Sequence, residues 1–389
     1  MSETSTHRAQ GPPTPAPSTP RSSTPGPPLA ASSFPGPLVA SPPTRGQHAS
    51  TYTELSRRVR AAGLLDRRRG WYLRRITAAV AALAGVTALT VVLREGPLVL
   101  LAAAVCGLVL TQCAFLGHDG AHRQMFGSRR ADEWTGRLLA SLVCGLSHGW
   151  WLGKHTKHHQ APNQLGVDGD LDSSVLVFTP EAAQGRRGAL VRRVTRHQGW
   201  LFFPLLPLEG LALHVASTRR LLSPAPLARR RVDAALVLAH WTLAAAGLLL
   251  LLGPGLGAAY AGVSLAVFGT GMGLAFAPNH VGMPVVPRGA KVDFLRRQVL
   301  MSRDVGGGRW VSVAMGGLDK QVEHHLFPSM PRPNLARAQV LVRAYCAEQG
   351  IPYTETSVVG AYAAVVRHLH RTGLLAGSTR TCPLAAQLR

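Results

Sequence analysis

The chain has 389 residues, 46% of which are hydrophobic, and it carries a formal net charge of +23. Such an apolar fraction beside so strong a charge indicates that apolar and basic residues occupy separate segments. The arginines are spread over many short clusters that flank apolar stretches, and no recognisable DNA- or RNA-binding module accompanies them. The charge therefore argues against a nucleic-acid partner and for a membrane surface.

The chain opens with two segments that precede any long apolar run. Residues 1–50 are rich in Pro, Ser, Thr, Ala and Gly, so we expect a disordered N-terminal tail. Residues 51–75 form a basic juxtamembrane segment, which is either a short helix on the membrane surface or a solvated linker. As a helix, its apolar side would carry Leu55, Val59, Leu64 and Leu65. A cleaved signal peptide is not expected, because the first long apolar run begins so late.

Four long apolar runs follow, over residues 76–93, 97–117, 232–252 and 256–277. Each is close to the roughly 20 residues that a helix needs to cross about 30 Å of hydrocarbon. The links inside each pair of runs are very short, so the sequence predicts two helical hairpins. Arginine clusters lie at the other ends of the runs, which by the positive-inside rule places both termini and the long central segment in the cytoplasm.

These features together predict an all-α integral membrane protein of the plasma membrane, with four transmembrane helices in two hairpins. The membrane domain would cover residues 76–350, and residues 351–389 would form a C-terminal cytoplasmic tail. The five cysteines show neither disulfide nor zinc-site spacing, and we interpret them as small apolar residues. They are Cys106, Cys113, Cys144, Cys346 and Cys382.

Three histidine clusters lie on the predicted cytoplasmic side. Their members are His118, His122, His155, His158, His159, His324 and His325. In a helix, residues i, i+3 and i+4 share a face, so we expect each cluster to point its imidazoles at a common centre. Imidazole is a ligand for transition metals, and this many imidazoles are too many for one ion. The sequence therefore predicts a site for two metal ions.

Further candidates lie beside the clusters. His280 stands where the fourth apolar run ends, as His118 stands at the end of the second, and it is either an eighth ligand or a polar interface residue. Carboxylates near the clusters would orient ligand imidazoles or would be solvated loop residues. These carboxylates are Asp119, Glu323, Asp168, Asp170 and Asp172.

A metal pair held by imidazoles at a membrane surface has two interpretations. One is an O2-dependent oxidase acting on an acyl chain or another lipid, because iron in a nitrogen-rich shell suits attack on unactivated C–H bonds. The other is a membrane metal-dependent hydrolase or a metal-handling protein, because imidazole also binds zinc, copper and nickel.

The residues around the clusters resemble those of the integral-membrane fatty-acid desaturases. The similar motifs are Gly117-His118-Asp119, the histidine-rich segment 151–159, and the segment 321–328, and the resemblance covers residues 75–350. Gln321 at the first position of the third motif is similar to the front-end type of desaturase and to related bacterial acyl desaturases. Asn163 and the acidic segment 166–170 resemble the same subgroup.

The resemblance implies a cytoplasmic helical cap above the spanning helices, holding two non-haem iron ions. The seven clustered histidines and His280 would be the iron ligands, and Gln321 would be a weaker one, acting directly, through water or by hydrogen bonding. The implied reaction uses O2 to introduce a cis double bond into an acyl chain, which could be an acyl-CoA, a carrier-protein thioester or a lipid ester. Trp150, Trp151 and Phe276 would either line the acyl tunnel or anchor the chain at the membrane interface.

Two features bear on this implied reaction. A hydroxylase of the same superfamily would share the ligands and remains the closest alternative. The chain also has no haem-domain signature, no cysteine set for an iron–sulfur cluster and no dinucleotide fingerprint. We therefore expect a separate electron donor, a ferredoxin or a flavin-dependent reductase, that docks on the arginine-rich cytoplasmic face.

Overall fold

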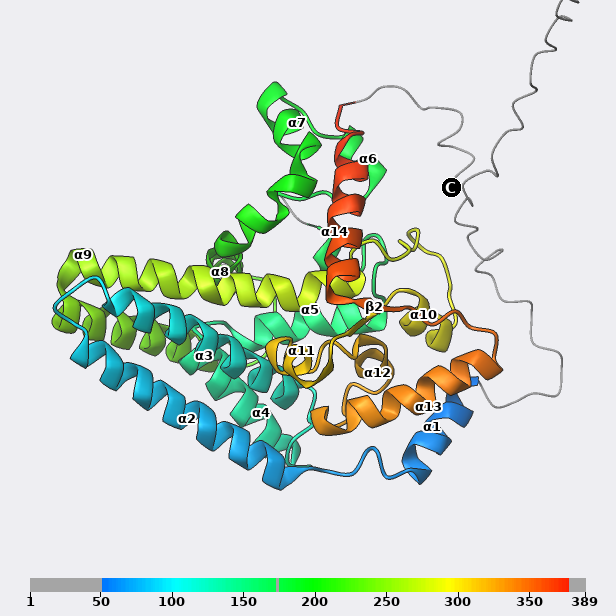
Figure 1. Cartoon of the computed structure of the whole chain (residues 1–389), viewed down its shortest axis with the longest axis horizontal. Helices are drawn as coiled ribbons and strands as arrows, with labels where there is room; N and C mark the ends of the chain where they lie inside the picture. The colour runs from blue at the N-terminus through cyan, green and yellow to red at the C-terminus, as the bar shows by residue number, and fades with distance from the viewer. Residues whose placement is uncertain (1–50, 173–174, 378–389) are drawn as a thin grey trace, which may run out of the picture. The chain divides into compact units, whose positions relative to one another are not determined.

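The computed structural model describes residues 51–172 and 175–377, and the predicted N-terminal tail lies outside them. Within these residues the chain is mostly helical (Figure 1). Its described strands are β1 (Asp304–Gly306) and β2 (Glu355–Ser357), which pair in parallel, with Asp304 opposite Glu355. The all-α prediction is thus confirmed apart from this small sheet.

Four helices are long and apolar enough to cross a membrane. They are α2 (Arg69–Val92), α3 (Val99–Ala121), α8 (Gln198–Leu222) and α9 (Arg230–His280). The first two predicted runs lie in α2 and α3, and the last two both lie in α9. Gly253 interrupts α9 with φ 71° and ψ 175°, and a Cβ atom on Gly257 would lie 3.1 Å from the Leu248 carbonyl oxygen. The two halves of α9 therefore turn back and contact each other beside Gly253 (Figure 1).

Helix α8 is a candidate span that the sequence interpretation missed. Its apolar pattern is interrupted by Pro204, Pro207, Glu209 and His214, so the sequence alone did not indicate a span here. The helix packs closely on α9, since a Cβ atom on Gly210 would lie 2.3 Å from the Leu265 carbonyl oxygen. Small residues at such contacts let two helix backbones approach, as is common within membranes.

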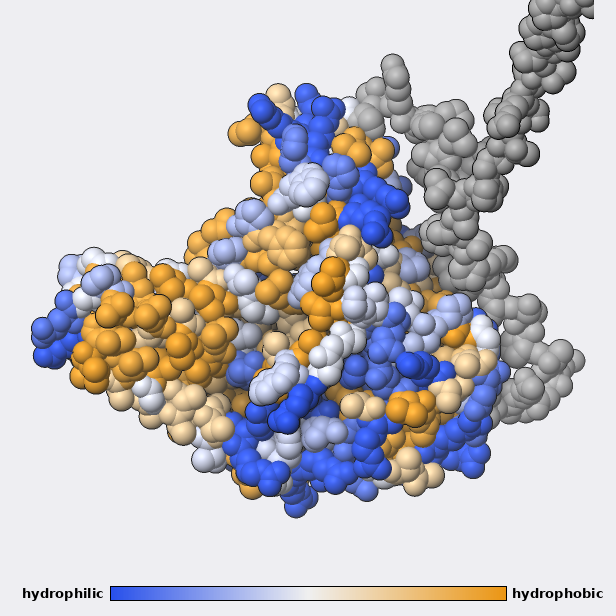
Figure 2. Space-filling model, viewed as in Figure 1, coloured by the Kyte–Doolittle hydropathy of each residue, from blue (hydrophilic) through white to orange (hydrophobic). Residues whose placement is uncertain are grey.

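The long helices expose much apolar surface. Leu250 of α9 is 85% exposed and Val92 of α2 is 77% exposed. Figure 2 shows hydrophobic residues gathered where Figure 1 places α9 and the neighbouring long helices. Soluble proteins rarely expose contiguous apolar patches of this kind, whereas lipid-facing helices do.

Shorter helices lie beside the ends of α3 and α9 that carry His118 and His280. They are α4 (Arg129–Arg137), continued by a π-helical turn (Leu138–Val143), α5 (His148–Gln160), α10 (Phe294–Leu300), α11 (Gly308–Ala314), α12 (Gln321–Leu326) and α13 (Leu335–Glu348). Buried side chains of α10, α12 and α13 share one hydrophobic core with α1 (Thr51–Ala61).

Helix α1 covers the first part of the predicted juxtamembrane segment, and its apolar side packs against protein. Leu55, Val59 and Leu64 were expected on a side open to the membrane. They are buried in the core shared with α10, α12 and α13, because those helices present matching apolar faces. Tyr345 also donates a hydrogen bond to the Thr51 carbonyl oxygen at 2.6 Å.

The remaining elements are shorter helices and turns. They are a 3-10 turn (Gly169–Leu171), α6 (Pro180–Gln184), α7 (Ala189–Arg196), a second 3-10 turn (Arg332–Asn334) and α14 (Val358–Gly373). Part of the expected C-terminal tail thus forms β2 and α14, and Val365 and Leu369 pack against Phe202 and Leu206 of α8. Residues 378–389 lie outside the described residues. Cys106, Cys113, Cys144 and Cys346 are free thiols, as predicted, and Cys382 also falls outside.

Candidate metal centre

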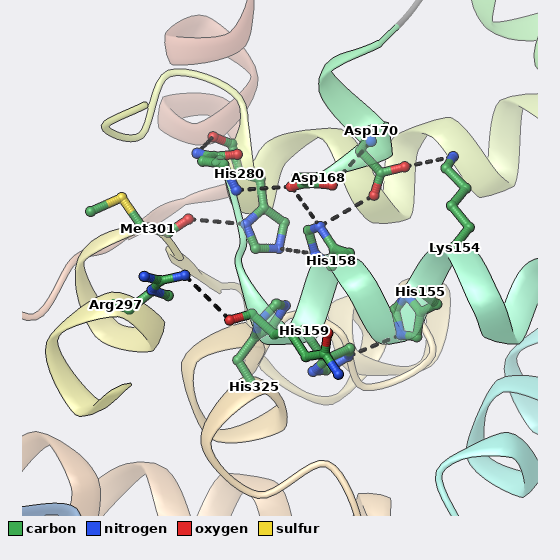
Figure 3. A network of polar contacts seen from close by, with 12 residues as sticks. Lys154, His155, His158, His159, Asp168, Asp170, His280, Arg297, Met301 and His325 are labelled. Carbon is green, nitrogen blue, oxygen red and sulfur yellow. Dashed lines mark hydrogen bonds and ion pairs between the residues drawn. The ribbon is translucent and has the colours of Figure 1, made fainter. Parts of the chain in front are cut away.

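Four separate stretches of chain deliver the eight predicted histidines to one place. The last turn of α3 carries His118, and His122 caps this helix; α5 carries three histidines, α9 ends at His280, and α12 carries two. In α12, His324 and His325 are each 1% exposed. Figure 3 shows side chains from α5, α9 and α12 pointing toward one another.

The histidines form two groups that could each hold a metal ion. The first group is His118, His122, His155, His159 and His324, and the second is His158, His280 and His325, with ligand atoms within 4.8 Å of one another inside each group. The groups adjoin, since the rings of His159 and His325 stack with centroids 4.2 Å apart. Two adjacent sites are what the histidine count predicted.

The second and third sequence clusters each contribute histidines to both groups. We expected each cluster to point at one centre, but His158 is in the second group while His155 and His159 are in the first. His324 and His325 are separated in the same way. Consecutive helical residues point about 100° apart, so only the i and i+4 members of α5 share a direction.

The second group is held by hydrogen bonds on the far side of each ring. The Nδ1–H groups of His158, His280 and His325 donate to Asp168 Oδ2 at 2.9 Å, the Met301 carbonyl oxygen at 3.0 Å and Gln298 Oε1 at 2.9 Å. Each ring therefore presents Nε2 to the centre, and the Nε2 atoms of His158 and His280 lie 3.3 Å apart (Figure 3). Outer partners of this kind fix the tautomer of a metal-binding imidazole.

The first group carries ring nitrogens without partners. Nε2 of His118, His122 and His324 and Nδ1 of His159 are buried and have no hydrogen-bond partner among the described residues. Nε2 of His155 and Nε2 of His159 lie 2.9 Å apart. Unpaired buried polar atoms are costly, and several that converge on one point fit a bound cation.

The protonation states suit metal binding. Burial, reinforced by neighbouring imidazoles, holds the pKa of His155, His159, His324 and His325 well below the ordinary value. These rings are therefore neutral, which is the form that binds metal. Burial also lowers the pKa of His158, but its hydrogen bond to Asp168 and the charge of Asp170 outweigh burial and raise that pKa.

Gln321 lies against the second group. Its side chain is 1% exposed, and its Nε2 donates to His280 Nε2 at 2.8 Å, while its Oε1 accepts from Asn279 Nδ2 at 3.3 Å. The amide thus stands beside the nitrogen that faces the centre. The structure therefore brings Gln321 and all eight predicted histidines together.

An apolar cavity of about 260 Å³ opens beside the histidines. His155, His158 and His280 line one part of it, and most of the other lining residues are apolar. Trp150 and Trp151 of α5 and Phe276 of α9 all line it, as expected for tunnel walls. Trp151 also stacks on His155, with ring centroids 4.2 Å apart.

Comparison with known protein families identifies the family that combines such a candidate centre with long apolar helices. The family described as fatty acid desaturase matches residues 95–357. The chain belongs to the fatty acid desaturase family. The match includes every histidine of both groups and Gln321, so the desaturase match and the metal centre coincide.

Curated relatives of this desaturase family member carry matching names. An acyl-lipid (9-3)-desaturase of Physcomitrium patens is 31% identical over 70% of this chain and 53% of its own length. A delta(8)-fatty-acid desaturase of Helianthus annuus is 28% identical over 74% of this chain and 65% of its own, and a delta(5) fatty acid desaturase of Caenorhabditis elegans is 27% identical over 78% and 69%. The chain spans about half to two thirds of the length of the first two.

Of the carboxylates expected beside the histidines of this desaturase family member, some contact a histidine and others do not. Asp168 and Asp170 both contact His158, the second at 3.3 Å. Asp119 lies 3.3 Å from His118 Nδ1 and pairs with Arg332 at 2.6 Å. Within the described residues, Glu323 and Asp172 contact no histidine of either group. Glu323 instead accepts from the Tyr353 hydroxyl at 2.9 Å, inside a buried cluster that holds α12.

Several supporting residues of the centre carried no sequence signal. Gln298 accepts from His325 and donates to the His159 carbonyl oxygen at 2.9 Å, so it joins the two histidine groups. Asp304 accepts from the Val322 backbone N–H at 3.0 Å and so anchors α12. A lone glutamine or aspartate in a loop has no spacing pattern, and only the packing reveals these roles.

Proposed function

We propose that the chain is a membrane fatty-acyl desaturase that uses O2 and two externally supplied electrons to introduce a cis double bond into an acyl chain. The observation that carries this proposal is the apolar cavity that opens on His155, His158 and His280, members of the two histidine groups. An acyl chain in this cavity would lie with its methylenes against the centre. The family membership and the names of the relatives support the same reaction.

The proposed cofactor is a pair of non-haem iron ions, one in each histidine group. Neutral imidazoles with converging, unpaired nitrogens fit such ions, and Gln321 would complete the second group. When bound, the pair would activate O2 for the removal of one hydrogen from each of two neighbouring methylenes. Asp168, Gln298 and the Met301 carbonyl oxygen would keep the ligand rings in their orientation.

In this reaction the chain's own residues would position the acyl substrate. Trp150, Trp151 and Phe276 would narrow the cavity so that only a bent chain brings two adjacent carbons to the centre. The apolar lining would also exclude water, which would otherwise compete with the substrate for the oxidant. The polar end of the substrate, as acyl-CoA, carrier-protein thioester or lipid ester, would stay at the cavity mouth.

The proposed placement is the plasma membrane, with α2–α3 and the two halves of α9 as two hairpins. The short helices and the metal centre would form a cap on the cytoplasmic side, and both termini would lie on the same side. Support comes from α2, α3 and α9, three of the four candidate spans, and from arginines at the ends of these helices that lie nearer the histidines. Cysteine labelling of residues 94–96 and of α13 in intact cells tests this topology.

Mass spectrometry of the products tests the proposed reaction against its rivals. Incubation with acyl substrates, O2 and an electron donor should give products that have lost two hydrogens. A gain of one oxygen would identify a hydroxylase of the same superfamily instead. If the active protein contains two zinc ions and no iron, and if it works without O2, it would be a metal-dependent hydrolase.

Substitution of Gln321 tests whether the amide belongs to the centre. We expect Gln321→His to keep two iron ions and to lower activity by about tenfold at most, because an imidazole beside His280 can bind the same ion. Gln321→Ala should lose more activity than Gln321→His. Iron content and turnover of the two variants are compared with the parent. Full activity in Gln321→Ala would remove Gln321 from the site.

Filling the cavity should separate substrate binding from metal binding. Gly273 lines the cavity, and a Cβ atom there would already lie 2.5 Å from Leu206 Cδ2. We therefore expect Gly273→Leu to lower activity by at least about tenfold with iron content unchanged, because the side chain occupies acyl space. Gly262→Leu is the matched control on the same helix, where a Cβ atom meets nothing within 4 Å. Equal activities of the two variants would contradict this position for the acyl chain.

The electron donor is proposed to be a ferredoxin or a flavin-dependent reductase that binds the arginine-rich face. Opposite charges steer such partners together, and salt screens the attraction. The rate of electron transfer from the native donor should therefore fall as ionic strength rises. A rate that does not depend on salt would rule out electrostatic docking.

A further inference from the structure

A second hollow lies on the surface at the start of α2. Its volume is about 410 Å³, and five arginines line it. They are Arg67, Arg68, Arg69, Arg74 and Arg337. The hollow shares no lining residue with the acyl cavity, so it is a separate feature of the molecule. We call it the arginine groove.

The charges of the arginine groove are not balanced by the protein. No acidic residue lines it, and within the described chain none of its five arginines forms an ion pair. Arg67 and Arg68 are tied to neutral groups, namely backbone carbonyls and Asn334 Oδ1 at 3.0 Å. Among the described residues, Arg69, Arg74 and Arg337 have no hydrogen-bond partner, and all three are exposed. Five guanidinium groups around one hollow repel one another unless an anion joins them.

The backbone adds to this positive potential. Helix α2 begins at Arg69 without a capping side chain and without an acidic residue in its first turn. The N-terminus of a helix carries partial positive charge and usually attracts acidic residues, so arginines there are unfavourable by themselves. A phosphate would compensate both charges, because guanidinium groups bind phosphate oxygens in pairs.

The surroundings of the arginine groove indicate whether the phosphate belongs to a free ion or to a phospholipid. Helix α2 is a candidate span, so its first residues would lie at the level of the lipid headgroups, and Trp71 in the groove is a residue type typical of that level. Apolar surface continues from the groove along the helix, with Leu73 56% exposed and Val80 60% exposed. Figure 2 shows hydrophilic residues gathered where Figure 1 places the start of α2. A free phosphate would use only the groove, whereas a phospholipid would use both surfaces.

We propose that the arginine groove binds the phosphate of an anionic phospholipid, whose acyl chains lie along α2. This site rests on the proposed membrane placement of α2 and not on the desaturase reaction. Its ligand is a structural lipid of the cytoplasmic leaflet, bound away from the acyl cavity. An acidic protein is disfavoured as the occupant because a concave groove beside a lipid-facing helix offers it little contact surface.

Native mass spectrometry of the full-length protein in detergent tests this site. Phosphatidylglycerol and phosphatidylcholine with the same acyl chains are titrated in parallel. The parent should prefer phosphatidylglycerol by at least about tenfold. The variant R69Q/R74Q/R337Q should lose this preference, because it removes the arginines that have no other partner. The control R130Q/R193Q/R196Q removes the same net charge from exposed arginines elsewhere and should stay within about twofold of the parent.

Four outcomes would overturn the proposal. They are a groove variant that binds like the parent, a control that loses the preference equally, inorganic phosphate that displaces the lipid at equal concentration, and a groove variant that loses only donor-dependent activity. Iron content is measured for each protein, and two iron ions show that a variant is folded. Loss of desaturase activity without loss of lipid preference would count against the proposed reaction alone.

Discussion

His324→Ala should abolish activity, and His158→Ala should do the same from the other histidine group. The two residues are 1% and 4% exposed and belong to different groups, so each variant should lose the ion of its own group. We expect less than about 1% of parent activity, because loss of a direct ligand should exceed the 10- to 100-fold effects of outer partners. Iron per chain should fall from two to at most one.

Iron content and the amount of protein in the membrane fraction decide how these results are interpreted. Both residues lie outside the long apolar helices, so membrane insertion should be unchanged. His197→Ala is the matched control, since His197 is exposed and, within the described residues, its side chain bonds only to the Arg193 carbonyl oxygen. A fully active His324 variant with two iron ions would remove that residue from the centre.

Asp233→Ala should have the largest effect on stability. Asp233 is fully buried; one carboxylate oxygen pairs with Arg137, and the other accepts from Ser147 Oγ at 2.8 Å and from the Gly149 backbone N–H at 2.7 Å. Ser147 in turn caps the start of α5. The variant leaves the buried Arg137 charge poorly compensated, which costs about 3–5 kcal/mol. We expect the midpoint of thermal unfolding to fall by about 5–15 °C.

A double variant separates the unpaired charge from the lost cap. Asp233→Ala combined with Arg137→Met removes both charges, and it should recover part of the lost stability. The midpoint is measured by thermal shift at fixed detergent, lipid and iron concentrations, since bound ligands change it. If the double variant melts no higher than Asp233→Ala, the stranded arginine is not the cause of the loss.

The histidine spacing predicted that these side chains would gather because helical periodicity is a local property. His155 and His159 lie four residues apart and do share a group. The spacing could not predict that His158 joins His280 and His325, because that choice depends on how α5, α9 and α12 pack together. Gln298 and Asp304 were missed for the same reason, since each acts on residues far away in the sequence.

The fold was predictable where apolar residues run without interruption and not elsewhere. The runs over 76–93 and 97–117 became α2 and α3. Helix α8 was missed because Pro204 and Pro207 lie inside it, and propensity alone predicts a break at such residues. The contacts with α9 at Gly210 and Gly269 keep α8 helical there, which a single-sequence pattern does not contain.

Helix α5 contributes to the metal centre and to the cavity wall at once. His155 and His158 belong to different histidine groups and also line the cavity, with Trp151 stacked on His155. Under the proposed function, a change on this helix would therefore disturb catalysis and substrate fit together. Divergence of substrate preference within the family would then accumulate on the wall formed by other helices, at lining positions such as Leu206 of α8 and Met272 of α9. Engineering of a new chain length should begin on that wall.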